Sequence, residues 1–402
     1  MKDGQKSFIR SLSARGAVSI CKEDETNMDV MVNAQRLTQV RKLLQDRDIS
    51  YKVSVTSTMS NSPNRVRSPV KATPMIRRLS PPINKGLDFK DFYPLQTIYD
   101  FLDSLEFQLP STCSVIVIGK SVEGRDIKMF KISNSNANNQ AVWIDGAIHA
   151  REWITIAAVT FIAEYIAKNF SQLPTYITNK DWYFVPVVNP DGYHCTHTLD
   201  RMWRKNRARV GNHICGVDLN RNFSHSWGRN TREPLSIDPF HINYKGPAPF
   251  SEPETTAIKD FILYSGTPFK VFLTFHAFSE VISFPWCYTQ MPCMDYVTLL
   301  EGGTVMAKAM YETNGRMYKV GNFKDIMYAA SGTSIDWSYG VAGILFSYLI
   351  ELPSKEHRFL FPKEGIEGCC KEALNGIIAL VQFIDGKKGI GCGLFLQENK
   401  TS

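Results

Sequence analysis

Apolar residues recur at two different spacings between about residue 85 and the C-terminal region of the chain. A spacing of about three to four residues is typical of helices that cover a core, and it occurs at Leu95–Leu105, Glu152–Ala167 and Lys371–Ile384. Short apolar runs rich in β-branched and aromatic residues indicate strands, at Ser114–Gly119, Lys128–Ile132, Ala141–Ile144, Trp182–Val188, Phe269–Phe275 and Ile344–Ile350. The last three runs are apolar at most positions, as in strands that are buried on both faces.

This alternation of strands and helices predicts an α/β domain over residues 85–390. A helix between two strands returns the chain to the end of the sheet at which the first strand began, so that the two strands run in parallel. We therefore expect a central mixed, largely parallel sheet that is covered by helices on both faces.

The chain before residue 85 has a different pattern. Residues 1–28 are expected to form a tail. Asp29–Asn33 predicts a short strand, Ala34–Asp46 an amphipathic helix, and Ser50–Thr56 a strand with one buried face. The resulting α+β piece, residues 29–56, buries too little surface to be stable alone, so we expect it to dock on the larger domain.

Residues 57–84 are rich in Ser, Pro, Asn and Arg, and this composition predicts an exposed linker. The linker contains the dibasic pair Arg77-Arg78, which in an exposed loop is the kind of site that a trypsin-like protease cuts. Composition alone is equally compatible with a linker that stays intact.

The formal net charge of +7 at first suggests a nucleic-acid partner. Residues 1–80 hold 15 Lys and Arg against 7 Asp and Glu, which leaves 31 and 32 for the remainder of the chain. The excess positive charge therefore belongs to the N-terminal region, and neither nucleic-acid binding nor, without an apolar run of spanning length, a membrane segment is expected. Met1–Ile20 lacks the apolar core of a signal peptide, and nine cysteines without a regular spacing leave the localisation open.

Residues able to bind a metal follow several predicted strands. His149 and Glu152 follow the strand at Ala141–Ile144, and His276 and Glu351 each come directly after a later strand. Functional residues of open α/β sheets gather beyond the C-terminal ends of the strands. Two imidazoles and one carboxylate are a known ligand set for catalytic zinc. An isolated histidine is more often a surface or core residue, but the location of these residues at the ends of separate strands favours a zinc site.

Seven stretches of the chain carry a resemblance to one family: His149-Ala-Arg-Glu152-Trp153, Asn189-Pro-Asp-Gly-Tyr193, Arg201-Met-Trp-Arg204-Lys205, Asp218-Leu-Asn220-Arg221-Asn222, His276, Tyr328 with Ser331–Trp337, and Glu351-Leu352. Over roughly residues 30–385 the sequence resembles the zinc carboxypeptidases of the pancreatic carboxypeptidase A and B type. Residues 29–56 resemble only the second half of the family's pro-domain, a truncated pro-segment. The resemblance implies a secreted, monomeric zinc exopeptidase that acts on the C-termini of peptides and proteins and is activated by a trypsin-like protease.

The resemblance also implies roles for individual residues. One zinc ion per chain would be bound by His149, Glu152 and His276. Asp218 would accept the second N–H group of His149 and fix its tautomer. Zinc would activate water and polarise the scissile carbonyl, and Glu351 would act as general base and then general acid.

Arginine residues would recognise the substrate. Arg204 would stabilise negative charge on the carbonyl oxygen. Arg221, together with Asn220, would bind the terminal carboxylate in two places, and Tyr328 would close over it. Arg151 would support an outer subsite.

The floor of the specificity pocket would be Ile335, which offers neither charge nor a hydrogen bond. The other pocket positions implied by the resemblance are also uncharged: Thr274, Ser283, Cys287, Phe323, Met327 and Leu349. We therefore expect cleavage of C-terminal Phe, Leu, Tyr or Met, and little cleavage of Lys, Arg, Asp or Glu. Cys287 stands where the family tends to have a smaller residue and would favour aliphatic over aromatic ends.

Three positions depart from the family. Phe278 replaces a common Tyr, Pro353 changes the backbone behind Glu351, and Cys215 lacks the cysteine with which it would pair. An alternative interpretation is a zinc-containing binding protein that has lost catalysis. Such a loss normally removes a ligand, the base or the carboxylate-binding arginine, and all of these are present.

Overall fold

The computed structural model describes residues 3–14, 18–23, 27–32, 37–51, 86–229 and 237–387. The expected linker, with Arg77-Arg78, and most of the strand expected at Ser50–Thr56 lie outside the described residues. None of the helices in these ranges combines the length and the apolar character needed to cross a bilayer.

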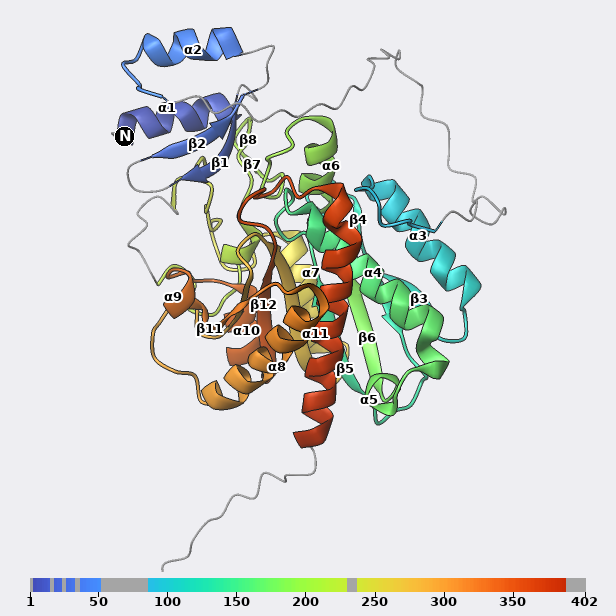
Figure 1. Cartoon of the computed structure of the whole chain (residues 1–402). Helices are drawn as coiled ribbons and strands as arrows, with labels where there is room; N and C mark the ends of the chain where they lie inside the picture. The colour runs from blue at the N-terminus through green and yellow to red at the C-terminus, as the bar shows by residue number, and fades with distance from the viewer. Residues whose placement is uncertain are drawn as a thin grey trace, which may run out of the picture.

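The main domain is built on an eight-stranded sheet (Figure 1). In spatial order its strands are β11 (Lys319–Asn322), β10 (Val281–Phe284), β12 (Phe346–Leu352), β9 (Phe269–Ala277), β5 (Gln140–Asp145), β6 (Lys180–Val185), β4 (Asp126–Ile132) and β3 (Cys113–Lys120). The central strands β12, β9, β5 and β6 are parallel to one another, whereas β3, β4 and the pairing of β10 with β12 are antiparallel. The prediction of a mixed, largely parallel sheet is confirmed.

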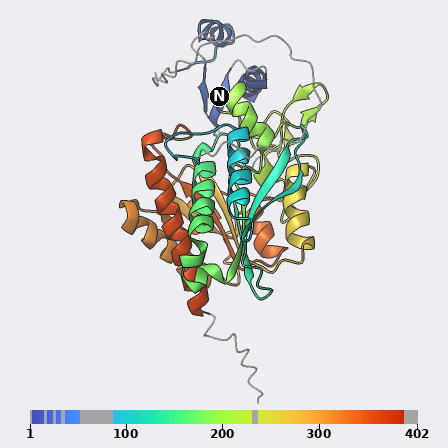
Figure 2. The same ribbon diagram turned by 90° about the vertical axis from the view of Figure 1, so that its right-hand side faces the viewer.

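Helices cover both faces of this sheet because the central strands are apolar on both sides. On β5, Val142 and Ile144 join the core beneath one helical layer, and Ala141 and Trp143 join the core on the opposite face. The first layer contains α3 (Leu95–Gln108), α4 (Trp153–Asn169), α8 (Tyr296–Asn314) and α11 (Ile366–Lys387). Figure 2 shows α3, α4 and α11 side by side. The opposite layer contains α7 (Pro253–Tyr264) and α10 (Ser334–Gly340).

The first 28 residues were expected to be a tail, but they contain α1 (Asp3–Ala14) and β1 (Ser19–Glu23). Together with β2 (Met28–Met31) and α2 (Leu37–Gln45) these elements form a small N-terminal unit (Figure 1). Its core consists of Ile9, Leu12, Val18, Ile20, Val40, Leu44 and Ile49. Apolar residues of α1 are therefore buried against residues of α2. The sequence pattern of residues 1–28 alone does not show that α2 will cover this helix.

Polar contacts between described residues join the N-terminal unit to the main domain. Nη1 of Arg10 lies 3.3 Å from Oδ2 of Asp238. Nη1 of Arg151 donates to the carbonyl oxygen of Ile20 at 2.8 Å. The unit thus contacts the main domain at a residue that the sequence analysis had assigned to substrate binding.

Candidate active site

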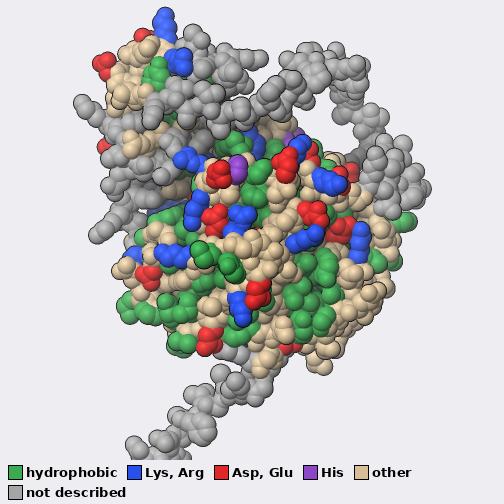
Figure 3. Space-filling model, viewed as in Figure 1, with side chains coloured by type: hydrophobic (Ala, Val, Ile, Leu, Met, Phe, Trp, Pro, Cys, Tyr) green, Lys and Arg blue, Asp and Glu red, His purple; other side chains and the backbone are tan. Residues whose placement is uncertain are grey.

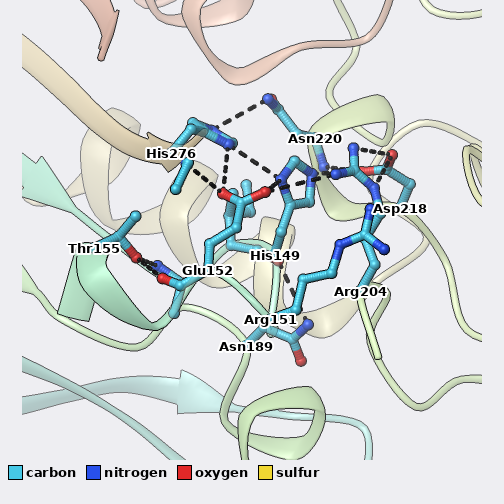
Figure 4. A network of polar contacts seen from close by, with 12 residues as sticks. His149, Arg151, Glu152, Thr155, Asn189, Arg204, Asp218, Asn220 and His276 are labelled. Atoms are coloured by element: carbon cyan, nitrogen blue, oxygen red, sulfur yellow. Dashed lines mark hydrogen bonds and ion pairs between the residues drawn. The ribbon is translucent and has the colours of Figure 1, made fainter. Parts of the chain in front are cut away.

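Three potential metal ligands converge near the C-terminal ends of β5 and β9 (Figure 4). His149 lies in the loop after β5, Glu152 directly precedes α4, and His276 is the penultimate residue of β9. Nδ1 of His149 lies 2.9 Å from Oε1 of Glu152 and 3.1 Å from Nδ1 of His276. Oε2 of Glu152 lies 3.1 Å from the same nitrogen of His276. All three side chains are buried.

This donor set fits a zinc ion. Two imidazole nitrogens facing each other at 3.1 Å, both beside a carboxylate, leave unshared electron pairs that a cation would satisfy. Burial and the neighbouring Arg204 guanidinium hold the pKa of His149 below its ordinary value, so its ring is neutral, as a ligand must be. Although burial opposes it, the two imidazoles hold the pKa of Glu152 far below its usual range, which keeps it ionised.

Asp218 connects one ligand to the arginine beside the site. Its Oδ1 lies 3.1 Å from Nε2 of His149, and its Oδ2 accepts from Nη2 of Arg204 at 2.9 Å. Because the carboxylate accepts the Nε2–H of His149, Nδ1 keeps its lone pair for a metal. Nη1 of Arg204 lies 3.7 Å from Oε1 of Glu152, so the guanidinium lies at the edge of the ligand cluster.

Glu351 lies on β12 and pairs in register with His276 on β9. Its Oε2 is buried and has no hydrogen-bond partner among the described residues. Burial raises the pKa of Glu351 to about 7. An unpartnered carboxyl group with this pKa beside a metal site has the properties of a general base.

A second group of residues can bind a carboxylate. Arg221 and Asn220 come from the short 3₁₀ helix Leu219–Arg221, which begins with the Asp218 side chain accepting from the backbone N–H of Asn220. Nη2 of Arg221 donates to the hydroxyl of Tyr328 at 3.3 Å. The Tyr328 side chain is 46% exposed. A guanidinium next to a partly exposed tyrosine can bind an anionic chain end.

Ile335 lies in the first turn of α10 and is fully buried. It belongs to one apolar cluster with Cys287, Phe323, Leu349 and the partly buried Met327. The adjacent Asp336 is the acid nearest to Ile335 in sequence, and its two oxygens accept from the backbone N–H of Cys287 at 2.9 and 3.1 Å. That carboxyl group therefore has a structural partner.

The guanidinium of Arg151 contacts an aromatic ring. It lies over the ring of Phe359, 4.0 Å from the centroid, and the rings of Phe278 and Phe359 are 4.8 Å apart. Phe278, which stands where the family commonly has tyrosine, thus packs against the ring that contacts the Arg151 guanidinium.

All ten predicted site residues are described, and they fall into four groups. The metal ligands lie with Glu351 and Arg204, and the carboxylate group is linked to them through Asn220, whose Nδ2 is 3.4 Å from Nε2 of His276. Ile335 lies in the apolar cluster with Cys287, and Arg151 contacts Phe359. Cys215, Cys287 and Cys293 are free thiols. Asp145, a buried acid that ends β5, was not among the residues predicted from the sequence. The available signal was an acidic residue directly after the apolar run Ala141–Ile144.

The chain is similar to known carboxypeptidases over most of its length. A family model described as zinc carboxypeptidase matches residues 98–376. Carboxypeptidase B of Astacus astacus is 35% identical over 301 residues, which cover 74% of this chain and 98% of that protein. Carboxypeptidase A1 of Mus musculus is 33% identical over 361 residues, covering 88% and 83% of the two chains. The crystal structure of thrombin activatable fibrinolysis inhibitor is similar with a TM-score of 0.74 and 27% identity, covering 95% of this chain and 96% of that one.

Proposed function

The chain belongs to the zinc carboxypeptidase family, and from that premise we propose which residues perform its reaction and which C-terminal residues it removes. Its activity is zinc-dependent hydrolysis of the C-terminal peptide bond of peptides and proteins. The metal would be held by His149, Glu152 and His276, whose ligand atoms lie within 4.8 Å of one another. When bound, zinc supplies a Lewis acid that polarises the scissile carbonyl and activates water.

Glu351 is the general base in this proposal. Its buried, unpartnered oxygen can take a proton from the attacking water and later give that proton to the leaving amine. Arg204, at the edge of the ligand cluster, stabilises the negative charge that develops on the carbonyl oxygen.

Arg221, Asn220 and Tyr328 bind the terminal carboxylate and thereby make the enzyme an exopeptidase. The planar guanidinium can donate two parallel hydrogen bonds, one to each oxygen of the carboxylate. The exposure of Tyr328 allows its ring to close over the bound end of the chain. Ile335 and its uncharged neighbours then receive the C-terminal side chain.

The side-chain preference follows from desolvation. An unpaired ammonium or guanidinium in this apolar cluster would cost several kcal/mol, whereas burial of a Phe or Leu side chain gains about 1.5–3 kcal/mol. Each 1.4 kcal/mol corresponds to about a factor of ten, so we propose at least about a hundredfold preference for apolar over charged ends. Phe323 and Cys287 narrow the proposed specificity pocket, so that aliphatic C-terminal residues of the substrate are favoured over aromatic ones.

The observation that carries the mechanism is the unpartnered oxygen of Glu351 in register with His276. The test is hydrolysis of blocked dipeptides by the trypsin-treated Glu351→Gln variant, with and without a chelator. Turnover should fall by at least about 10² while one zinc stays bound. Glu254→Gln, which changes another buried acid outside the site, should retain turnover. Wild-type turnover in Glu351→Gln would contradict the assignment.

We further propose that the N-terminal unit is a partial pro-segment, released by a trypsin-like protease at Arg77-Arg78, and that the enzyme is a secreted monomer. The contact of Ile20 with Arg151 supports the assignment of the unit as a pro-segment. The carbonyl oxygen of Ile20 accepts a hydrogen bond from the Arg151 guanidinium, which would otherwise face a substrate. A cavity of about 40 Å³ between the unit and the domain is lined by Arg10 and Ile20 on one side and Arg204 on the other.

A further inference from the structure

Asp145 is a buried acid that touches none of the metal ligands directly. It is the last residue of β5 and lies opposite Thr274 of β9 in the register of the two parallel strands. Its Oδ2 accepts from Nε1 of Trp143 at 2.7 Å, and its Oδ1 accepts from the hydroxyl of Thr274, also at 2.7 Å. Both oxygens are therefore engaged by fixed donors.

The Thr274 hydroxyl continues this chain of contacts toward the metal site. Its oxygen lies 3.3 Å from Nε2 of His276. A hydroxyl carries a single hydrogen, and here that hydrogen points to the Asp145 carboxylate. The hydroxyl oxygen is thus left as an acceptor for an N–H group on Nε2 of His276.

This proton arrangement determines which ring nitrogen of His276 can bind a metal. With hydrogen on Nε2, the neutral ring keeps its lone pair on Nδ1. Nδ1 is the atom that lies 3.1 Å from both Oε2 of Glu152 and Nδ1 of His149. The amide group of Asn220 competes with this arrangement and favours the opposite tautomer, because its Nδ2 faces Nε2 of His276 at 3.4 Å while its oxygen accepts from the backbone N–H of Ser334.

We propose that Asp145 is a positioning residue which, through the Thr274 hydroxyl, holds His276 in the tautomer that binds zinc. The inference rests on the proposed role of His276 as a ligand. Each imidazole of the site then has its own carboxylate: Asp218 contacts His149 directly, and Asp145 acts on His276 through one hydroxyl. Thr274, assigned above to the wall of the specificity pocket, has this second function.

The test is zinc affinity, measured by competition of the purified full chain with a fluorescent zinc chelator. Thr274→Val keeps the shape of the side chain and removes the hydroxyl, so the zinc dissociation constant should rise by about 10- to 100-fold. Thr274→Ser should restore affinity close to that of the wild type. Ser347→Ala removes another fully buried hydroxyl, on the adjacent strand β12, and should leave zinc affinity unchanged.

Asp145→Asn tests the proton arrangement itself. The Trp143 donor will hold the amide oxygen, which turns the amide NH₂ group toward Thr274. The hydroxyl then accepts from this group and directs its own hydrogen to Nε2 of His276, which favours the tautomer that cannot bind zinc through Nδ1. We expect weaker zinc binding and a change of the His276 tautomer in ¹⁵N-histidine NMR of the zinc-free protein.

The outcomes separate the two proposals. If the wild-type chain binds no zinc, the metal-site assignment fails. If it binds one zinc and Thr274→Val, folded as judged by circular dichroism, binds equally tightly, the relay fails. An unchanged His276 tautomer in Asp145→Asn would also overturn the relay.

Discussion

Burial raises the pKa of the acids Glu351, Asp336 and Glu254, among others, yet the surroundings of these three give them different roles. Asp336 accepts from the backbone N–H of Cys287, and Glu254 accepts from the backbone N–H of Val122 at 3.0 Å. Glu351 alone among these three has a buried oxygen without a partner in the described chain. Hydrogen-bond satisfaction therefore distinguishes the candidate base from the structural acids better than the pKa does.

Glu254 should make the stability of the fold depend on pH. Burial raises its pKa from 4.5 to about 7, so the folded chain holds a proton that the unfolded chain releases. The stabilisation is fully present below the unfolded pKa and is lost as pH rises through about 7. We expect the thermal midpoint of the wild type to fall between pH 5 and pH 8, by an amount equivalent to up to about 3 kcal/mol.

Differential scanning fluorimetry of Glu254→Gln across this pH range measures the contribution of that group. The variant should show a smaller fall, because Gln does not titrate. Glu364→Gln, at an exposed position, should follow the wild type. Parallel pH profiles for all three proteins would show that the Glu254 proton is not linked to folding.

Ile335→Asp should change the substrate preference while the metal site stays intact. A carboxylate at this buried position gives a C-terminal Lys or Arg an ion-pair partner and removes apolar surface from the pocket. We expect the ratio of kcat/KM for Lys over Phe to rise by at least about a hundredfold. Ile344→Asn replaces another buried isoleucine of the same cluster and should leave the ratio unchanged. A wild-type enzyme that cleaves Lys faster than Phe would contradict the pocket assignment.

Residues at the ends of apolar runs that also match a family motif could be predicted, but residues that only strand pairing brings to the site could not. His149, Glu152 and His276 were predicted from their places after apolar strands and from the family resemblance, and zinc and the family are confirmed. Asp145 and Thr274 are 129 positions apart and meet because β5 pairs with β9. Sequence patterns give the strands but not their neighbours.

At the scale of secondary structure, each element predicted in the main domain is present with shifted ends. The prediction missed β10 and β11, which have four residues each, because such short strands leave little periodic signal. It also missed α8, which contains the adjacent glycines Gly302 and Gly303. Their lack of side chains admits Tyr348 and Val320 to the helix surface, so long-range packing overrides the weak local preference for helix.

The turn before α10 should tolerate no side chain at Gly332. Its φ of +67° favours glycine, and an added Cβ would meet the carbonyl oxygen of Arg221. Gly332→Ala should therefore displace the arginine and raise KM more than it lowers kcat. Gly315→Ala is the matched control, since its φ is +69° but its surroundings are open. The control should lose about 1 kcal/mol of stability and keep its KM; equal KM values for both variants would argue against the link to Arg221.

At the scale of the whole molecule, the distribution of charge is that of a catalytic domain and not of a nucleic-acid-binding domain. Figure 3 shows Lys and Arg interspersed with Asp and Glu on the displayed face. The basic excess in the first 80 residues instead includes Arg10, which is buried against the main domain with a contact to Asp238. Positive charge here contributes to an internal interface.

Loss of Arg10 from this interface should activate the uncut chain. Arg10 is 3% exposed, and its contact with Asp238 helps to hold the unit whose Ile20 carbonyl occupies Arg151. Arg10→Ala removes a charged hydrogen bond worth about 1.5–3 kcal/mol, so the unit should detach more often and the activity of uncut protein should rise about tenfold or more. Lys42→Ala, at an exposed position on α2, should leave it unchanged. After trypsin has cut at Arg77-Arg78, wild type and both variants should reach the same kcat/KM on blocked dipeptides. Equal activity of cut and uncut wild type would mean that the N-terminal unit does not restrain the enzyme.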